Sequence, residues 1–459
     1  MSRTRIVKGT YTKITGGDHS MYAKGNIVTT AGKSINEIGK EKGITYNMPK
    51  SPPKKQSATR VKEIELITPL DLGSKNDGKG KTQEGFIFGK TYKFKVKSFT
   101  NGNPVSNKLI RWMYKYHNLT TNKWVEEHSK IKGDQYSLYF NEKEMCGRFV
   151  YIRAYIDDED NEGELKRWHH NRFRWFDRSI IEDEIKERTD NKKPWLVNQS
   201  GTSLCGMACI FYLFAKEQPN EYKKFAKTLF RTGEATFNKY IVKPSEELFE
   251  INYRNSSYPS SSGKKMPLVD YITMAGTRNT GNPRYKGGSE QFQAINTPWF
   301  MDDLCTYLLG YNDVSSINSY NIAKKGKSLY DHLSKSAYYE KIQDLIDSLN
   351  EKLSKGYRLI LNIDSDLIAN DEDYHIPNNP FKKSEWEKTR KSTFEPEYHW
   401  VVLESPIQSM IPNLDKDGKS FYTINFKVFS WGDPVGTYLK NPITYDHFYH
   451  NYYGDVNAK

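Results

Sequence analysis

Alternating apolar and polar residues mark a run of short strands between residues 86 and 178. The segments 91–99, 108–116, 135–140 and 149–156 place apolar or aromatic side chains at every second position, as half-buried strands do. Asn-Gly and Lys-Gly-Asp sequences between them supply turns. This spacing predicts an all-β, immunoglobulin-like sandwich over 86–178, which serves as a spacer or binding module.

From residue 180 to the end, helical and strand patterns are mixed, and helices precede strands. Apolar residues at helical spacing predict helices that end at glycines, and uninterrupted apolar runs predict buried strands. The expected elements are helices over 205–216, 221–233 and 336–356, a helix opening at Pro298, a long loop over 253–297, and strands over 356–361, 397–406 and 421–436. We therefore expect one α+β domain over 180–459.

The first 48 residues have a short internal period. Glycines recur at positions 17, 25, 32 and 39, and each separates a brief alternating segment. Such short strands need stacking to be stable, so residues 1–48 are expected to form a β-helix-like segment or an ordinary small β-meander. Residues 49–85 are rich in Pro, Lys, Ser and Gly and are expected to be a linker, with a strand over 60–70 that joins the next domain.

Composition excludes a disordered chain. Of the 459 residues, 36% are hydrophobic and 14% aromatic, enough to fill the cores of several domains. The net charge of +13 comes from scattered lysines and arginines, which favours a solvated basic surface over a nucleic-acid partner. Neither a signal peptide nor a membrane span is expected, and the four cysteines are too few for a disulfide framework. We therefore expect the protein to be synthesised in the reducing cytoplasm of a bacterium.

The candidate chemistry centres on Cys205, which opens an apolar helix six residues after Gln199. A thiolate nucleophile needs a general base and a donor for the oxyanion, and a helix N-terminus is expected to lower the thiol pKa. His399 begins a buried strand and can act as base, and Asp433 lies at the end of the following strand. These residues predict catalysis by Cys205, His399 and Asp433, with Gln199 at the oxyanion.

Each of these residues also has a simpler interpretation. Cys205 can be a buried core thiol, Gln199 a helix cap, His399 a strand histidine and Asp433 the first residue of a turn. His375 is a competing base, but it lies in a polar loop that makes a poor rigid support. The other cysteines are expected to pack rather than react; they are Cys146, Cys209 and Cys305.

The motifs resemble those of papain-like cysteine peptidases, above all the bacterial branch that trims double-glycine leader peptides. They are Gln-x5-Cys-Gly at 199–206, Gly-Tyr-Arg-Leu-Ile-Leu at 356–361, His-Trp-Val-Val-Leu at 399–403 and Trp-Gly-Asp-Pro-x-Gly at 431–436. Papain has Asn before its Ser-Trp-Gly, whereas this chain has Phe429, so the orienting residue is expected to be Asp433, with Ser430 as the alternative. The resemblance implies a thiol hydrolase with neither metal nor cofactor.

The N-terminal glycine pattern resembles type VI secretion spike proteins and the segments that precede toxin domains in Bacteroidetes-type bacteria. That resemblance implies a secreted antibacterial effector with a secretion spike or other delivery apparatus and an immunity protein as partners, delivered into a target cell. The substrate is expected to be a protein or peptidoglycan. Alternatives are a peptidoglycan amidase, a glutamine deamidase or transglutaminase on the same fold, and a non-catalytic spike accessory or adhesion protein.

Overall fold

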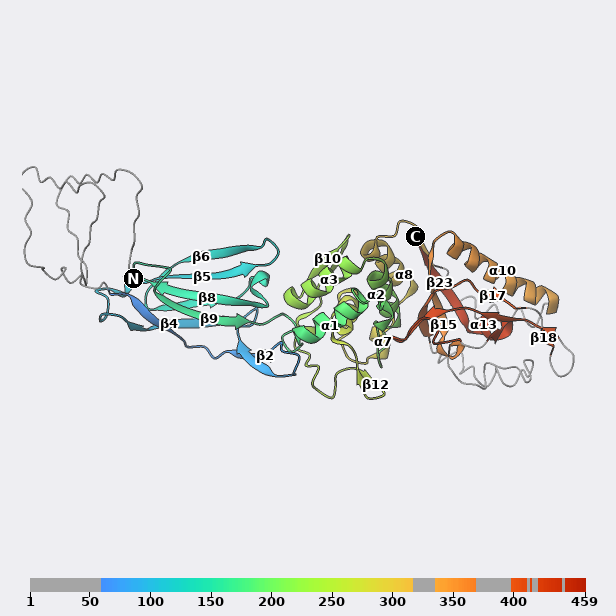
Figure 1. Ribbon diagram of the computed structural model, residues 1–459, viewed down its shortest axis with the longest axis horizontal. Coiled ribbons are helices and arrows are strands. Elements are labelled where there is room, and N and C mark those ends of the chain that lie inside the picture. The colour runs from blue at the N-terminus through green and yellow to red at the C-terminus, as the bar shows by residue number, and fades with distance from the viewer. Residues whose placement is uncertain (1–58, 317–334, 369–397, 411–412, 415–419, 440–441) are drawn as a thin grey trace, which may run out of the picture.

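The protein is elongated, with three consecutive parts along its long axis. The computed structural model describes residues 59–316, 335–368, 398–410, 413–414, 420–439 and 442–459. An all-β part lies at one end, a helical part in the middle and a second sheet at the other end (Figure 1). The expected spike-like segment, residues 1–48, lies outside the described residues. Taken together, the described elements form a mixed α+β chain with many small antiparallel sheets.

The all-β part consists of two antiparallel sheets that share one core. Tyr92, Phe94 and Val96 point inward from one sheet, and Val150 and Ile152 meet them from the other, as the alternation predicts. One sheet has the order β1-β4-β7 and the other β6-β5-β8-β9. Their strands are β1 (Val61–Leu66), β4 (Thr91–Phe99), β5 (Arg111–Asn118), β6 (Lys123–Lys132), β7 (Gln135–Tyr139), β8 (Arg148–Tyr155) and β9 (Gly163–His169).

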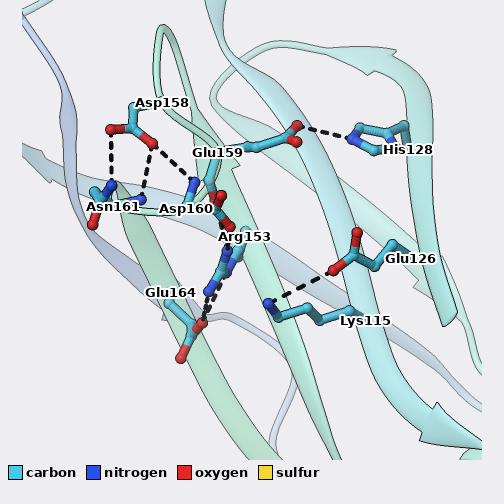
Figure 2. Close-up of polar contacts among 9 residues, drawn as sticks. All are labelled: Lys115, Glu126, His128, Arg153, Asp158, Glu159, Asp160, Asn161 and Glu164. Carbon is cyan, nitrogen blue, oxygen red and sulfur yellow. Dashed lines mark hydrogen bonds and ion pairs between the residues drawn. The ribbon is translucent and has the colours of Figure 1, made fainter. Parts of the chain in front are cut away.

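Charged side chains cross-link the outer surface of the four-stranded sheet (Figure 2). Arg153 bonds Glu164 on the neighbouring strand at 2.8 Å and Asp160 in the β8–β9 loop at 2.9 Å. Lys115 and Glu126 pair across β5 and β6 at 3.8 Å, a distance at which an exposed ion pair contributes little. These contacts order the loop and the strand edges, and they account for the charged residues between the apolar ones.

The segment expected to be a linker is partly ordered. Beyond the predicted strand β1, β2 (Asp71–Ser74) and β3 (Thr82–Gly85) form a hairpin on the start of helix α1 (Arg178–Arg188). Asp177 caps α1 through Ser179 N–H at 2.9 Å and also accepts from Gly78 N–H at 3.1 Å. The hairpin is held by polar bonds rather than by apolar burial, which explains why its composition suggested a linker.

The helical part contains a helix where the sequence predicted a loop. Residues 253–297 include a continuous helix made of α5 (Leu268–Asp270), the π-helical turn Tyr271–Ala275 and α6 (Gly276–Gly281), called the α5–α6 helix below. Its residues 268–279 are all buried, so it has no polar face and no helical period to detect. The expected helices form as α2 (Cys205–Glu217), α3 (Pro219–Thr232) and α8 (Pro298–Asp303), and the short elements are α4 (Glu246–Phe249), α7 (Gln291–Ala294), β10 (Ala235–Phe237), β11 (Tyr240–Val242), β12 (Ser260–Ser261) and β13 (Lys264–Lys265).

A five-stranded antiparallel sheet of order β14-β23-β15-β16-β21 lies between α2 and helix α10. Tyr212 of α2 stacks on Phe429 with ring centroids 3.8 Å apart, and Ile342 and Ile346 of α10 cover the opposite face. The predicted strand over 421–436 is divided, because β20 pairs in a separate small sheet and only β21 joins the large one. The elements are β14 (Val314–Ser316), α10 (Lys335–Ser354), β15 (Arg358–Asp364), β16 (Tyr398–Leu403), β17 (Gln408–Ser409), β18 (Asn413–Leu414), β19 (Ser420–Phe421), β20 (Thr423–Asn425), β21 (Val428–Phe429), β22 (Ile443–Thr444), α13 (Tyr445–Asn451) and β23 (Tyr452–Ala458).

Within the described ranges, every helix is too short or too polar to cross a bilayer.

A buried ion pair joins α1 to the α5–α6 helix. Arg188 Nη2 lies 2.6 Å from Asp270 Oδ2, and their side chains are 3% and 0% exposed. The same aspartate oxygen accepts from Asn198 N–H at 2.9 Å, and the guanidinium also donates to the Leu196 carbonyl at 2.8 Å. The pair therefore ties two helices to the segment that leads into Gln199.

We expect Asp270→Asn to lower the free energy of unfolding by about 3–5 kcal/mol, because it leaves the Arg188 charge buried without its partner. Urea denaturation monitored by tryptophan fluorescence measures the change. The matched control is Glu187→Gln, which removes the exposed pair between Glu187 and Lys193 and should cost no more than about 1 kcal/mol. Equal losses in the two variants would contradict a special role for the buried pair.

Candidate active site

Cys205 is the first residue of α2, and its thiol faces backbone donors. The helix begins after Leu204 without a side-chain cap, so its first N–H groups are available. Backbone N–H groups of Cys205 itself, Gly206 and Trp400 favour the thiolate form of Cys205 and so act to lower its pKa. Trp400 belongs to β16, at the other end of the chain from α2. The thiol thus lies between a helix N-terminus and the strand that carries His399.

His399 is fixed by two neighbours from the segment that follows β21. Its Nε2 lies 2.7 Å from Ser430 Oγ, and its ring stacks on the Trp431 indole with centroids 4.5 Å apart and planes 24° from parallel. His399 is 4% exposed and Ser430 is 2% exposed. These contacts hold the ring in one orientation and leave Nδ1 as the nitrogen that is not bonded to Ser430. The sequence motif contained Trp431 but gave no signal for this stacking.

The structure places Asp433 differently from the expectation. Asp433 Oδ2 accepts from the Tyr438 hydroxyl, and the Asp433 N–H donates to the Ser430 carbonyl at 3.2 Å. Trp431 and Gly432 have φ values of 48° and 79°, so the chain turns sharply before it reaches Asp433. The hydrogen-bond partner of the His399 ring is Ser430, the alternative orienting residue.

Gln199 lies in a tight turn against the same segment. Its side chain is 6% exposed, and Nε2 donates to the Thr202 carbonyl at 3.0 Å. A primary amide carries two N–H groups, so this bond leaves one for an oxyanion. A Cβ on Gly432 would come within 2.5 Å of Asn198 Nδ2, which shows how closely the two turns pack. The sequence-predicted oxyanion donor therefore sits where the α2 loop meets the Ser-Trp-Gly turn.

Burial determines the protonation of the cysteine and the histidine. It raises the pKa of Cys205 to about 11 despite the three N–H donors, and it lowers the pKa of His399 to about 3. The sequence predicted that the helix N-terminus lowers the thiol pKa. In the fold the pKa rises instead, because desolvation of the thiolate raises it more than the backbone N–H groups lower it. At neutral pH Cys205 is therefore a thiol and His399 a neutral imidazole.

The other cysteines are buried in the cores, as the sequence predicted. Cys146, Cys209 and Cys305 are free and buried, and burial raises the pKa of each of them. In the described part of the chain, there is no group of three or more His, Cys, Asp or Glu side chains that could hold a metal ion. His375, the competing base, lies outside the described residues.

Comparisons of the chain with protein-family models, curated proteins and solved structures found no match.

The buried histidine makes stability depend on pH in the acid range. Because the pKa of His399 is about 3 in the fold and about 6.5 when unfolded, the unfolded chain binds more protons between these values. The contribution is complete above pH 6.5 and is lost as the pH falls toward 3, by about 1.4 kcal/mol per pH unit. We expect His399→Gln to flatten this dependence in urea titrations from pH 7 to pH 4.

The control is His128→Gln, since the His128 side chain is 50% exposed on the all-β part. It should leave the slope of stability against pH unchanged. An unchanged slope in His399→Gln would show that His399 is solvated in solution.

The hydrogen bond to Ser430 sets a second expectation. If Cys205 and His399 act together in a hydrolase, Ser430→Ala, which removes the hydrogen-bond partner of the His399 ring, should lower the rate of that reaction by about tenfold, the equivalent of one buried hydrogen bond. Asp433→Ala should cost less, because its carboxylate bonds Tyr438 rather than the ring. Steady-state kinetics of both variants decide between the two; a larger loss in Asp433→Ala would restore the sequence-based assignment.

Proposed function

We propose that the protein is a secreted antibacterial effector whose residues 180–459 form a papain-like cysteine hydrolase that cleaves an amide bond in a target-cell protein. The observation that carries the proposal is the position of Cys205 Sγ at a helix N-terminus, facing the N–H of Trp400, with His399 as the preceding residue of the strand. A helical half and a sheet half that meet at this point support a papain-like fold. The two antiparallel sheets of residues 61–169 support an immunoglobulin-like domain.

In the proposed reaction, His399 takes the proton of the Cys205 thiol as Sγ attacks the carbonyl carbon of the scissile amide. The Cys205 N–H and the second N–H of Gln199 Nε2 stabilise the oxyanion, at about 3 kcal/mol for a donor of this kind. The protonated His399 then gives its proton to the leaving amine as the C–N bond breaks. Water, deprotonated by His399, releases the acyl group and restores the thiol.

The neutral resting pair fits this sequence of proton transfers. Ser430 and Trp431 hold the ring while it gains and loses a proton, and neither group needs to ionise. His399 and Cys205 are only 4% and 6% exposed. A substrate can therefore reach them only when the site opens locally. Desolvation then strengthens the hydrogen bonds to the oxyanion.

Delivery and partners remain part of the proposal. Residues 1–48 would dock on a secretion spike or another delivery apparatus, and an immunity protein would protect the producing cell. The all-β part would act as spacer or binding module.

A different amide remains the second candidate substrate. A peptidoglycan amidase, or a glutamine deamidase or transglutaminase, would use Cys205 and His399 in the same way, and the site geometry is compatible with each. A non-catalytic spike accessory would need neither residue. The location of toxicity separates the peptidoglycan amidase from the candidates that act on proteins.

We expect the full-length protein to arrest growth when produced in the cytoplasm of a susceptible bacterium, whereas Cys205→Ala, made to the same level, is harmless. The reason is that a target-cell protein is reached from the cytoplasm, whereas peptidoglycan is reached only after export. Growth curves with and without a periplasmic export signal measure both. Toxicity restricted to the exported form would favour the amidase, and toxicity that persists in Cys205→Ala would exclude a thiol hydrolase.

A further inference from the structure

Asn296 is a buried side chain with unsatisfied hydrogen-bonding capacity next to the candidate nucleophile. It is 3% exposed, and within the described residues neither Nδ2 nor Oδ1 of its amide has a hydrogen-bond partner. A Cβ built on Gly206 would lie 2.7 Å from Asn296 Cβ and 2.9 Å from its Cγ. The amide therefore lies against the residue that follows Cys205.

The backbone around Asn296 is held from both sides of the site. The Asn296 carbonyl accepts from Trp400 Nε1 at 3.2 Å, and Trp400 follows the proposed base His399. The two preceding carbonyls, of Ala294 and Ile295, accept from Arg278 Nε at 3.2 Å and Arg278 Nη2 at 2.8 Å. Three successive carbonyls are thus fixed by side chains of the α5–α6 helix and of β16. A segment held this firmly presents the Asn296 amide in one position.

An unpaired buried amide is costly for the fold. Burying a polar group without a partner costs about 1–3 kcal/mol, and an apolar side chain of similar shape would avoid the cost. Asn279, in the same helical part, shows the usual arrangement: its Nδ2 donates to the Tyr285 carbonyl and its Oδ1 accepts from Ser245 N–H. Asn296 has the same burial without these bonds, which indicates that its partners come from a ligand.

We propose that Asn296 is a substrate-binding residue that pairs with an amide of the substrate at the bond attacked by Cys205. Nδ2–H donates to the substrate carbonyl oxygen, and Oδ1 accepts an N–H on the same side of the substrate. In a primary carboxamide this N–H belongs to the same amide group. In an extended peptide it belongs to the residue that carries the carbonyl, because the N–H of a trans peptide bond points away from its own carbonyl. The ligand class is a peptide or carboxamide group rather than an ester or a nitrile. This inference rests on the proposed function, because it takes Cys205 as the reacting atom.

A pair of small alkylating agents tests the pairing at Cys205. Iodoacetamide carries the amide on its reacting carbon, whereas iodoacetonitrile has the same carbon and leaving group and lacks both the carbonyl and the N–H. Both react with the same thiolate, so the ratio of their rates does not depend on the pKa of Cys205. Peptide mass mapping of the full-length protein follows Cys205 separately from the other cysteines.

We expect the ratio of iodoacetamide to iodoacetonitrile rates at Cys205 to exceed that of free cysteine by about tenfold, the factor that one or two neutral hydrogen bonds supply. Asn296→Leu should return the ratio to that of free cysteine. If this variant does not fold, Asn296→Asp, which keeps the shape and loses the donor, should lower the ratio as well. A ratio that is the same in wild type and variants overturns the inference.

Thermal unfolding distinguishes a ligand-binding role of Asn296 from a purely structural one. Asn296→Leu should keep or raise the unfolding temperature, whereas the matched control Asn279→Leu, which breaks two bonds, should lower it without changing the rate ratio at Cys205. A loss of stability in Asn296→Leu with an unchanged ratio would assign Asn296 to the core. If wild-type Cys205 reacts with neither reagent faster than Cys146, Cys209 and Cys305 do, the proposed function and this inference both fail.

Discussion

The packing of helix α2 against strand β16 is the contact on which the candidate site depends. It joins the first residue of α2 to a strand that lies almost two hundred residues later in the chain. Further along α2, Tyr212 stacks on Phe429 of β21, so the same helix is packed on the same sheet at a second point. Because α2 and β16 meet at this point, the strand that carries His399 lies against the helix that begins at Cys205.

The loop that carries Gln199 depends on a second constraint, the buried pair of Arg188 and Asp270. Burying two charges is expensive, and the pair is retained only because its remaining hydrogen-bonding groups are used. Those groups hold Leu196 and Asn198, the residues that lead into Gln199. An ion pair far from the reacting atoms therefore sets the geometry of the proposed oxyanion donor.

Burial gives the site its chemical character. A solvated cysteine at a helix N-terminus would be partly ionised, and the sequence alone suggested this state. In the fold, desolvation keeps both the thiol and the imidazole neutral at neutral pH. The Asn296 amide is likewise buried, and it is unpaired in the described residues.

The sequence predicted the elements whose apolar pattern is complete, namely α2, β15 and β16, and it placed Cys205 and His399 on them. It missed the α5–α6 helix because burial on all sides removes the helical period. Asp270 and Arg278 lie on this helix, so the sequence did not predict their contacts either. It favoured Asp433 over Ser430 because positive φ angles at Trp431 and Gly432 cannot be deduced from the motif. The position of Asn296 was likewise not predicted, since its neighbours Gly206 and Trp400 come from segments distant in the chain.

The central claim is that Cys205 is a nucleophile activated by His399, and the alkylation rates of the four cysteines in the native protein test it most directly. Each cysteine is buried, so burial alone would make all of them slow. The account predicts that Cys205 is modified first at neutral pH and that His399→Gln removes this advantage. Cys205 reacting at the rate of Cys146, Cys209 and Cys305, with or without His399, would contradict it.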